Sequence, residues 1–204
     1  MNCGGGEVMN VISHYDRLID EDNDPFRDSP ILQEYMNQWD GQVFVDSMCL
    51  SHSKKVLEIG VGTGRIAAKV APQCLKFTGI DISPKTIDRA KENLSNFGNV
   101  ELICSDFSEY VFEDTFDVIY SSLTMMHFED KLQFIIKVAR LLNDHGIFCL
   151  SIDKNTSKYI DMGNRRLKIY PDKIDSIRTL IPIADMIIVN QYETEFASII
   201  ICTK

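Results

Sequence analysis

The spacing of hydrophobic residues changes abruptly in the stretch Lys55–Ala68. An apolar run of Val56, Leu57 and Ile59 is interrupted by Glu58, glycines then occupy three alternate positions, and a helical pattern begins at Arg65. This order predicts a buried parallel strand, a glycine turn and the start of a helix. Glycines let a ligand approach the backbone closely, and a helix start exposes N–H groups. The stretch is therefore typical of a turn that holds a nucleotide-like cofactor.

Strand and helix patterns alternate through the middle of the chain. The predicted strands are Lys76–Ile80, Val100–Cys104, Phe116–Ser121 and Ile147–Ile152. Ser83 and Asp130 precede helical stripes, and Asn143–Gly146 is predicted as a turn. This alternation indicates βαβ units with right-handed crossovers, and hence an α/β fold with a parallel central sheet.

Helical spacing also marks the region before the first core strand. Apolar residues recur from Val8, from Ile31 and from Val43, which predicts three helices within residues 1–50. Gly4–Gly6 is predicted to be a frayed end. The helices are expected either to form a lid across the carboxyl edge of the sheet or only to cover its apolar surface.

The C-terminal third predicts a helix and two hairpins. Asp172–Leu180 is helical in pattern, and the apolar runs Met186–Gln191 and Phe196–Cys202 suit a terminal hairpin. Lys154–Tyr170 resembles a smaller hairpin inserted on the substrate side of the sheet, where open α/β sheets bind ligands. Its cations, Arg165, Arg166 and Lys168, are candidates for substrate contact or for a solvated face.

Composition narrows the class of protein. A length of 204 residues fits a single domain over residues 1–204, with 45% hydrophobic and 25% charged residues. The net charge of −9 disfavours nucleic acid and anionic membranes as partners. There is no signal-peptide pattern and no apolar run of 18 residues. The cysteines are scattered, which predicts reduced thiols in a cytoplasmic protein without a zinc site: Cys3, Cys49, Cys74, Cys104, Cys149 and Cys202.

Two cofactors compete for the glycine turn. Gly62-x-Gly64-x-x-Ala67 fits a dinucleotide fingerprint. Asp81 follows it at about the sequence separation expected for an acid that binds ribose, so NAD is not excluded. Glu58, two residues before Gly60, favours a cationic ligand instead. The glycine spacing alone leaves NAD open, and Glu58 tips the balance away from it.

Several motifs together resemble class I S-adenosylmethionine (SAM)-dependent methyltransferases. VLEIGVGTG, GID, CSDF, FDVIYSSLTMMH and LLNDHGIFCLSID occur in the family's order over Lys55–Asp153. The resemblance is to the small-molecule branch that includes quinone-biosynthesis C-methyltransferases. It implies a Rossmann-like, mostly parallel seven-stranded sheet with a C-terminal antiparallel hairpin. It also implies SAM as cofactor, S-adenosylhomocysteine as product, and direct in-line transfer of a methyl group to an unidentified small molecule.

The resemblance also implies a set of site residues. Asp81 would bind the ribose hydroxyls, Ile82 the adenine face, and Asp106 the adenine amino group. His127 is the candidate general base, with His14, Tyr15 and Tyr170 as weaker candidates. The predicted cofactor-binding residues are Tyr15, Glu58, Gly60, Val61, Gly62, Thr63, Gly64, Asp81, Ile82, Asp106, Phe107, Ser121, Ser122 and Leu123, and no metal is expected.

The chain departs from the family pattern at two places. Ala184-Asp185-Met186 replaces a common Ala-Gly-Phe, and Ser121–Thr124 lacks the Asn/Asp-Pro-Pro-aromatic signature of enzymes that methylate nucleobase or amide nitrogens. DNA and glutamine are therefore disfavoured as substrates. An NAD-dependent oxidoreductase and a SAM-binding protein without catalysis remain as alternatives, and the oligomeric state is not indicated.

Overall fold

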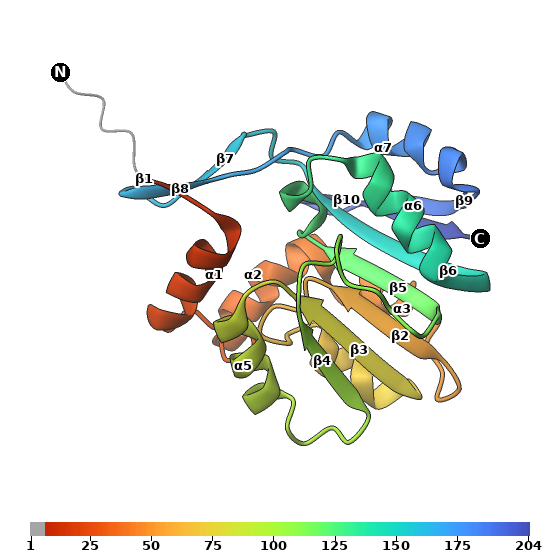
Figure 1. Cartoon of the computed structure of the whole chain (residues 1–204), viewed down its shortest axis with the longest axis horizontal. Coiled ribbons are helices and arrows are strands. Elements are labelled where there is room, and N and C mark those ends of the chain that lie inside the picture. The colour runs from red at the N-terminus through yellow and green to blue at the C-terminus, as the bar shows by residue number, and fades with distance from the viewer. Residues whose placement is uncertain (1–6) are drawn as a thin grey trace.

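A seven-stranded sheet forms the centre of the computed structural model, which describes residues 7–204 (Figure 1). Its order is β4-β3-β2-β5-β6-β10-β9. The first five strands in this order pair in parallel, and β10 is antiparallel to both of its neighbours, β6 and β9. This confirms the predicted fold class. Cys3 and the glycines of the predicted frayed end lie outside the described residues. The strands are β2 Lys55–Ile59, β3 Lys76–Asp81, β4 Val100–Cys104, β5 Phe116–Ser122, β6 Leu142–Asp153, β9 Ile187–Glu193 and β10 Ala197–Thr203.

Helices cover both faces of this sheet. Successive side chains along a buried strand point to opposite faces, so apolar side chains on each face need a covering layer. Leu57 packs in one core cluster with residues of α6 and α7, whereas Val56 packs in the other with residues of α3, α4 and α5. Ser83 and Asp130 cap α5 and α6 as expected, since their side chains accept hydrogen bonds from Thr86 N and Gln133 N. These helices are α3 Gln42–Asp46, α4 Ala67–Val70, α5 Pro84–Asn93, α6 Lys131–Leu141 and α7 Ile174–Leu180.

The N-terminal region differs from its prediction at the start. Val8 belongs to a short strand, β1 Glu7–Met9, and not to a helix. Helix α1 (Val11–Asp20) begins after Asn10, whose side chain accepts a hydrogen bond from Ser13 N at 2.8 Å. Helix α2 (Pro30–Asp40) follows the predicted pattern, while α3 buries Phe44 and Val45 in the main core and leaves Val43 exposed.

A second, three-stranded sheet lies beside α1 and apart from the central sheet (Figure 1). Strands β7 (Tyr159–Asp161) and β8 (Arg165–Lys168) form the predicted hairpin around Gly163, and β1 pairs in parallel with β8, which the sequence did not predict. We call β1, β7 and β8 the cap sheet. Leu167 packs against Met126, and the buried Arg165 pairs with Glu21 at the end of α1, which lowers the pKa of Glu21 to about 2. The cap sheet is thus fastened to α1.

Two turns depart from the sequence prediction or the family pattern. The predicted turn Asn143–Gly146 lies inside β6 as an irregularity in its pairing with β5, and Asn143 donates a hydrogen bond to Asp117 at 2.8 Å. Asp185 has a φ of +58°, a conformation that aspartate tolerates better than most residues. This explains how the chain does without the family's glycine there.

Candidate active site

A cavity of about 280 Å³ opens where the carboxyl ends of the parallel strands meet. Open α/β sheets bind ligands at this edge. The structure brings to its wall most of the residues predicted from the sequence, drawn from α1 and from the segments that follow β2, β3, β4 and β5: Tyr15, Gly60, Gly62, Asp81, Ile82, Asp106, Phe107, Ser122, Leu123 and His127.

A smaller cavity of about 130 Å³ shares the backbone of the glycine turn and the end of β5 with the first. It brings in three further predicted residues, Glu58, Val61 and Thr63, together with two that the sequence prediction missed, Asp40 and Arg65. Because the two cavities share wall residues, we treat them as one elongated site.

The glycine turn owes its shape to positive φ angles at Gly60 (+79°), Gly62 (+55°) and Gly64 (+96°). A Cβ atom on Gly60 would lie 2.0 Å from Thr124 Oγ1, whereas one on Gly62 would meet nothing within 4 Å. Gly60 is therefore required by the protein's own packing, and Gly62 leaves open space at the cavity wall. The helix that follows, α4, has only four residues, so a helix dipole adds little here.

Asp81 ends β3 and fixes the glycine turn. Its Oδ2 accepts a hydrogen bond from Gly62 N at 3.1 Å, and its Oδ1 accepts one from Ser83 N at 3.0 Å. Burial raises the pKa of this carboxyl. A carboxylate has about four lone-pair sites, so Asp81 keeps acceptor capacity that a ligand could use.

Glu58 is buried in β2 and accepts a hydrogen bond from Tyr120 Oη at 2.8 Å. Burial raises its pKa well above the usual range. A buried carboxyl beside a cavity, held by a neutral donor, is suited to a cationic group on a ligand, which would restore the charged form.

Asp40 and Arg65 form a buried ion pair that holds α2 against the turn. Arg65 Nη2 lies 2.5 and 2.6 Å from the two carboxylate oxygens, and Ser122 Oγ donates to Asp40 Oδ2 at 2.5 Å. Arg65 Nη1 is buried and has no hydrogen-bond partner among residues 7–204. The sequence offered one signal for this ion pair. Arg65 is a cation within the apolar stretch after the glycine turn, and a buried cation needs a buried partner of opposite charge.

The segments after β4 and β5 contribute unequally. Asp106 Oδ1 accepts hydrogen bonds from the N–H and the hydroxyl of Ser108, both at 2.7 Å, so it caps its own turn while it lines the cavity. Phe107 is buried among aromatic rings. Ser121 lies outside both cavity walls, and its hydroxyl donates to Ile59 O at 3.3 Å.

His127 lies in a short helical turn after β5 (η2, Met125–His127), where its Nε2 is 2.8 Å from Tyr15 Oη. Burial, with smaller contributions from His14 and Lys131, lowers the pKa of His127 to about 4. The imidazole is thus neutral at pH 7. The weaker candidate Tyr170 instead binds the same segment through its backbone, since its N–H donates to Met126 O and its O accepts from Lys131 Nζ.

The low pKa of His127 predicts a specific loss of stability in acid. With an unfolded pKa of about 6.5 and a folded pKa of about 4, only the unfolded chain takes up the proton between these values. Stability should therefore fall as the pH drops from 7 to 5, by about 2 kcal/mol from this residue. Urea unfolding of wild type and His127→Gln at both pH values measures it. Equal pH dependence in the two proteins would contradict the prediction.

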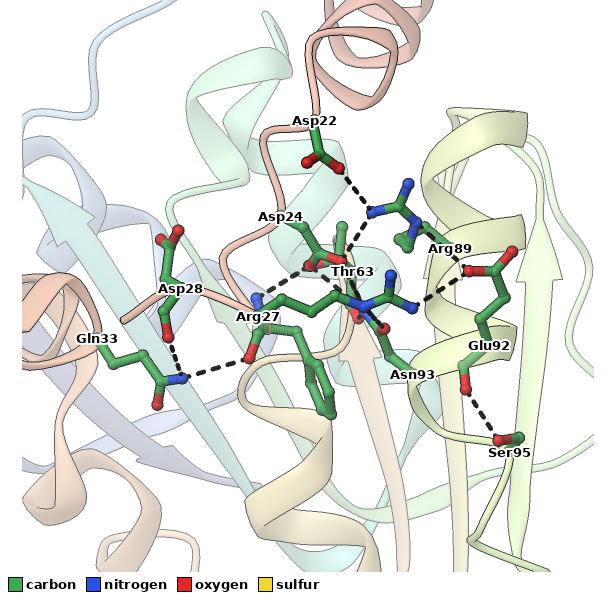
Figure 2. A network of polar contacts seen from close by, with 11 residues as sticks. Asp22, Asp24, Arg27, Asp28, Gln33, Thr63, Arg89, Glu92, Asn93 and Ser95 are labelled. Atoms are coloured by element: carbon green, nitrogen blue, oxygen red, sulfur yellow. Dashed lines mark hydrogen bonds and ion pairs between the residues drawn. The ribbon is translucent and has the colours of Figure 1, made fainter. Parts of the chain in front are cut away.

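The loop between α1 and α2 is tied to the glycine turn by a polar network (Figure 2). Asp24 accepts hydrogen bonds from Arg89 Nη1 (3.1 Å) and from Asn93 Nδ2 (3.2 Å), both on α5. The same Asn93 amide donates to Thr63 O at 3.0 Å, and Arg27 Nε donates to Asn93 Oδ1 at 2.8 Å. The N-terminal helices are thus coupled to the site through side chains of α5.

Residues 7–204 contain neither a cluster of metal-binding side chains nor a helix that could span a membrane. No three His, Cys, Asp or Glu side chains are grouped so that they could hold a metal ion. No helix in this range combines the length and the apolar character needed to cross a bilayer.

Comparison with known proteins identifies the fold and the domain. Residues 57–150 match the methyltransferase domain family. The chain is 25% identical to nodulation protein S of Rhizobium tropici over 123 residues, 58% of this chain and 52% of that protein. It is 29% identical to malonyl-[acyl-carrier protein] O-methyltransferase 1 of Ilyobacter polytropus over 106 residues, 51% of this chain and 40% of that protein. The chain thus spans about half the length or less of these curated relatives.

Solved structures show the same architecture over nearly the whole chain. The N-methyltransferase NodS from Bradyrhizobium japonicum, in complex with S-adenosylhomocysteine, aligns with a TM-score of 0.74 at 19% identity, covering 96% of this chain and 99% of that one. The [4+2]-cyclase SpnF aligns with a TM-score of 0.78 at 13% identity, covering 98% and 99%. Neither these proteins nor the domain match supports the NAD-dependent oxidoreductase that the glycine spacing left open. Residues 57–150 are therefore similar to the methyltransferase domain family, and the chain shares the fold of the solved N-methyltransferase.

Proposed function

We propose that this protein is a SAM-dependent methyltransferase that transfers a methyl group to a small-molecule acceptor by direct in-line displacement. The observation that carries the proposal is the elongated site itself. Asp81 lies on the wall of its larger cavity, and the unpartnered buried Arg65 Nη1 belongs to a residue on the wall of its smaller one. SAM has a ribose in its middle and a zwitterionic amino acid at one end, so the polar groups of the site and of the cofactor occur in the same order.

The residues present fit this cofactor. Asp81 can accept from ribose hydroxyls with its remaining lone pairs, and Ile82 and Phe107 offer apolar surface to the adenine. In the smaller cavity, Glu58 and Asp40 supply negative character for the α-amino group, while Arg65 Nη1 supplies a donor for the carboxylate. Gly62 leaves room for close approach. A dinucleotide pyrophosphate would instead meet two carboxyl groups.

Bound SAM supplies an activated methyl group on its sulfonium, so the chain needs no nucleophile of its own. Its residues bind, align and exclude water. His127 was predicted as a general base, but a group with a pKa of about 4 has little driving force to take a proton at neutral pH. We therefore propose that alignment provides most of the catalysis and that the acceptor presents an atom that is already nucleophilic.

Calorimetry with four ligands tests the cofactor assignment. We expect SAM and S-adenosylhomocysteine to bind, and NAD to give no heat of binding. Methylthioadenosine lacks the amino-acid end and should bind more weakly than S-adenosylhomocysteine, because it leaves Arg65 Nη1 without a partner. Binding of NAD with silent SAM titrations would overturn the proposal. A SAM-binding protein without catalysis is distinguished by an acceptor screen that detects S-adenosylhomocysteine as product.

Asp81→Ala should weaken S-adenosylhomocysteine binding by about tenfold or more. A hydrogen bond to a charged group contributes about 1.5–3 kcal/mol, and about 1.4 kcal/mol is a factor of ten in affinity. The matched control is Asp88→Ala on α5, which removes an exposed carboxylate outside the cavity walls. Because Asp81 also binds Gly62 N and Ser83 N, urea unfolding must show that the variant remains folded. Unchanged affinity in a folded variant would leave Asp81 a purely structural role.

We further propose that α1 and the cap sheet act as a lid over this site. The supporting observation is that Val11 and Tyr15 of α1 line the larger cavity. Helix α3 does not belong to this lid, although it lies within the predicted lid region 1–50, because its buried residues belong to the main core.

The acidic net charge supports a partner that is neither nucleic acid nor membrane. Free thiols at all five described cysteines suit a reducing, cytoplasmic setting.

A further inference from the structure

Tyr15 and His127 form a neutral pair on the wall of the larger cavity. The phenol oxygen lies 2.8 Å from the imidazole Nε2, and the two rings meet edge to face with centroids 5.5 Å apart. The other ring nitrogen, Nδ1, is buried without a hydrogen-bond partner in the described chain. Both residues line the cavity beside Gly60 and Asp81.

The single hydrogen between Tyr15 and His127 can belong to either partner. If the phenol donates, the neutral ring carries its proton on Nδ1, and a buried N–H remains without an acceptor. If Nε2–H donates, Nδ1 carries no hydrogen and has only an unused lone pair. The phenolic hydrogen is then available to another acceptor. Among buried backbone groups, orphaned N–H donors are rarer than under-satisfied acceptors, and we apply the same preference to the ring nitrogens. The second arrangement also turns a donor towards the cavity, where a ligand can satisfy it.

We propose that His127 donates its Nε2–H to the hydroxyl oxygen of Tyr15, so that the phenolic hydrogen is held ready for an oxygen atom of the bound ligand. The inference rests on the proposed methyltransferase function for the identity of that ligand. Tyr15 is then the residue that touches ligand, and His127 is a positioning residue that acts through it.

The surroundings of the pair support this assignment. Burial and the nearby charge of Asp81 raise the pKa of Tyr15, so the phenol keeps its hydrogen throughout the working pH range. The ring of His14 also meets Tyr15 edge to face, at 5.1 Å, which limits the phenol's freedom. His14 and the ammonium group of Lys131 both disfavour a charged His127, so the pair remains neutral.

The group recognised is an oxygen lone pair, which has two sources. It belongs either to the cofactor, as a carboxylate or hydroxyl oxygen, or to the methyl acceptor, as a carboxylate, carbonyl or hydroxyl oxygen next to the reacting atom. An acceptor built only of apolar groups around its nucleophile would leave the phenol unsatisfied.

Long-range ¹H–¹⁵N correlation spectra of the ligand-free protein test the direction of the hydrogen bond. The ring nitrogen that couples to both carbon-bound protons is Nε2, and its shift shows whether it carries hydrogen. His127→Gln identifies the His127 signals among the four histidines. We expect a protonated Nε2 and a bare Nδ1 at pH 7. A bare Nε2 would overturn the proposal. Because no ligand is needed, this result is independent of whether SAM is the cofactor.

Binding of S-adenosylhomocysteine to three variants then locates the oxygen. If it belongs to the cofactor, Tyr15→Phe and His127→Leu should each weaken binding about three- to tenfold, the range of one neutral hydrogen bond. His127→Gln should restore it, because the glutamine amide can also donate to Tyr15. Unchanged affinity in all three, with protonated Nε2, assigns the oxygen to the acceptor. A loss in Tyr15→Phe without a loss in His127→Leu would contradict the positioning role.

Discussion

Asp40→Ala is expected to lower the free energy of unfolding by about 3–5 kcal/mol, the cost of leaving a buried charge without its partner. Asp40 is 1% exposed and the Arg65 side chain 11% exposed, and the two are joined by contacts of 2.5 and 2.6 Å. The substitution also removes the acceptor of the Ser122 hydroxyl. Urea unfolding at pH 7 measures the loss.

Two controls separate the buried charge from a general effect of lost contacts. Asp88→Ala breaks an ion pair with Lys91 that is exposed on both sides, and should cost less than about 1 kcal/mol. The double variant Asp40→Leu/Arg65→Met removes both charges and should be more stable than Asp40→Ala. A loss in Asp40→Ala no greater than in Asp88→Ala would show that the pair does not hold α2 to the glycine turn.

Gly60→Ala should destabilise the protein by about 2–5 kcal/mol. A left-handed backbone costs a non-glycine residue about 1–2 kcal/mol, and overpacking adds about 1–3 kcal/mol. The new Cβ would lie 2.0 Å from Thr124 Oγ1, which itself donates to Ser122 O at 3.0 Å, so the segment after β5 must shift. Thermal and urea unfolding give the loss.

Gly62→Ala is the matched comparison, because it also has a positive φ but meets no protein atom within 4 Å. Its stability should fall only by the backbone term, about 1–2 kcal/mol. Its affinity for S-adenosylhomocysteine should fall further, since the methyl group enters the space left for the ligand. The reverse ordering of stability losses between the two variants would contradict the packing role of Gly60.

The order of elements in the fold could be predicted because local patterns determined it. Strands buried on both faces read as apolar runs, and Ser83 and Asp130 marked helix starts through side chains that bind nearby backbone. The parallel topology then placed Gly60, Asp81 and Asp106 at one edge. The family resemblance supplied the identity of the cofactor, which the glycine spacing alone had left open.

What could not be predicted depends on contacts between distant segments. Asp40 and Arg65 are 25 residues apart, and nothing in either local pattern names the other. The pairing of β1 with β8 could not be predicted either, because a strand of three residues is too short to show the alternation of apolar and polar residues. The role that we propose for His127 differs from the predicted one for the same reason. Its position after β5 could be predicted, but its low pKa depends on its burial in the folded chain, and its contact with Tyr15 depends on where α1 packs.

The pairing of β1 with β8 has a consequence for the order of events during synthesis. Glu7 leaves the ribosome early, but its partner Arg165 is made 158 positions later. At about 5–20 residues per second, the first strand must wait roughly 8–30 seconds for its neighbour. The strands of the parallel sheet up to β6 are complete before Arg165 is made, so they can pair in this interval. The cap sheet is therefore expected to assemble last, on a central sheet that has already formed.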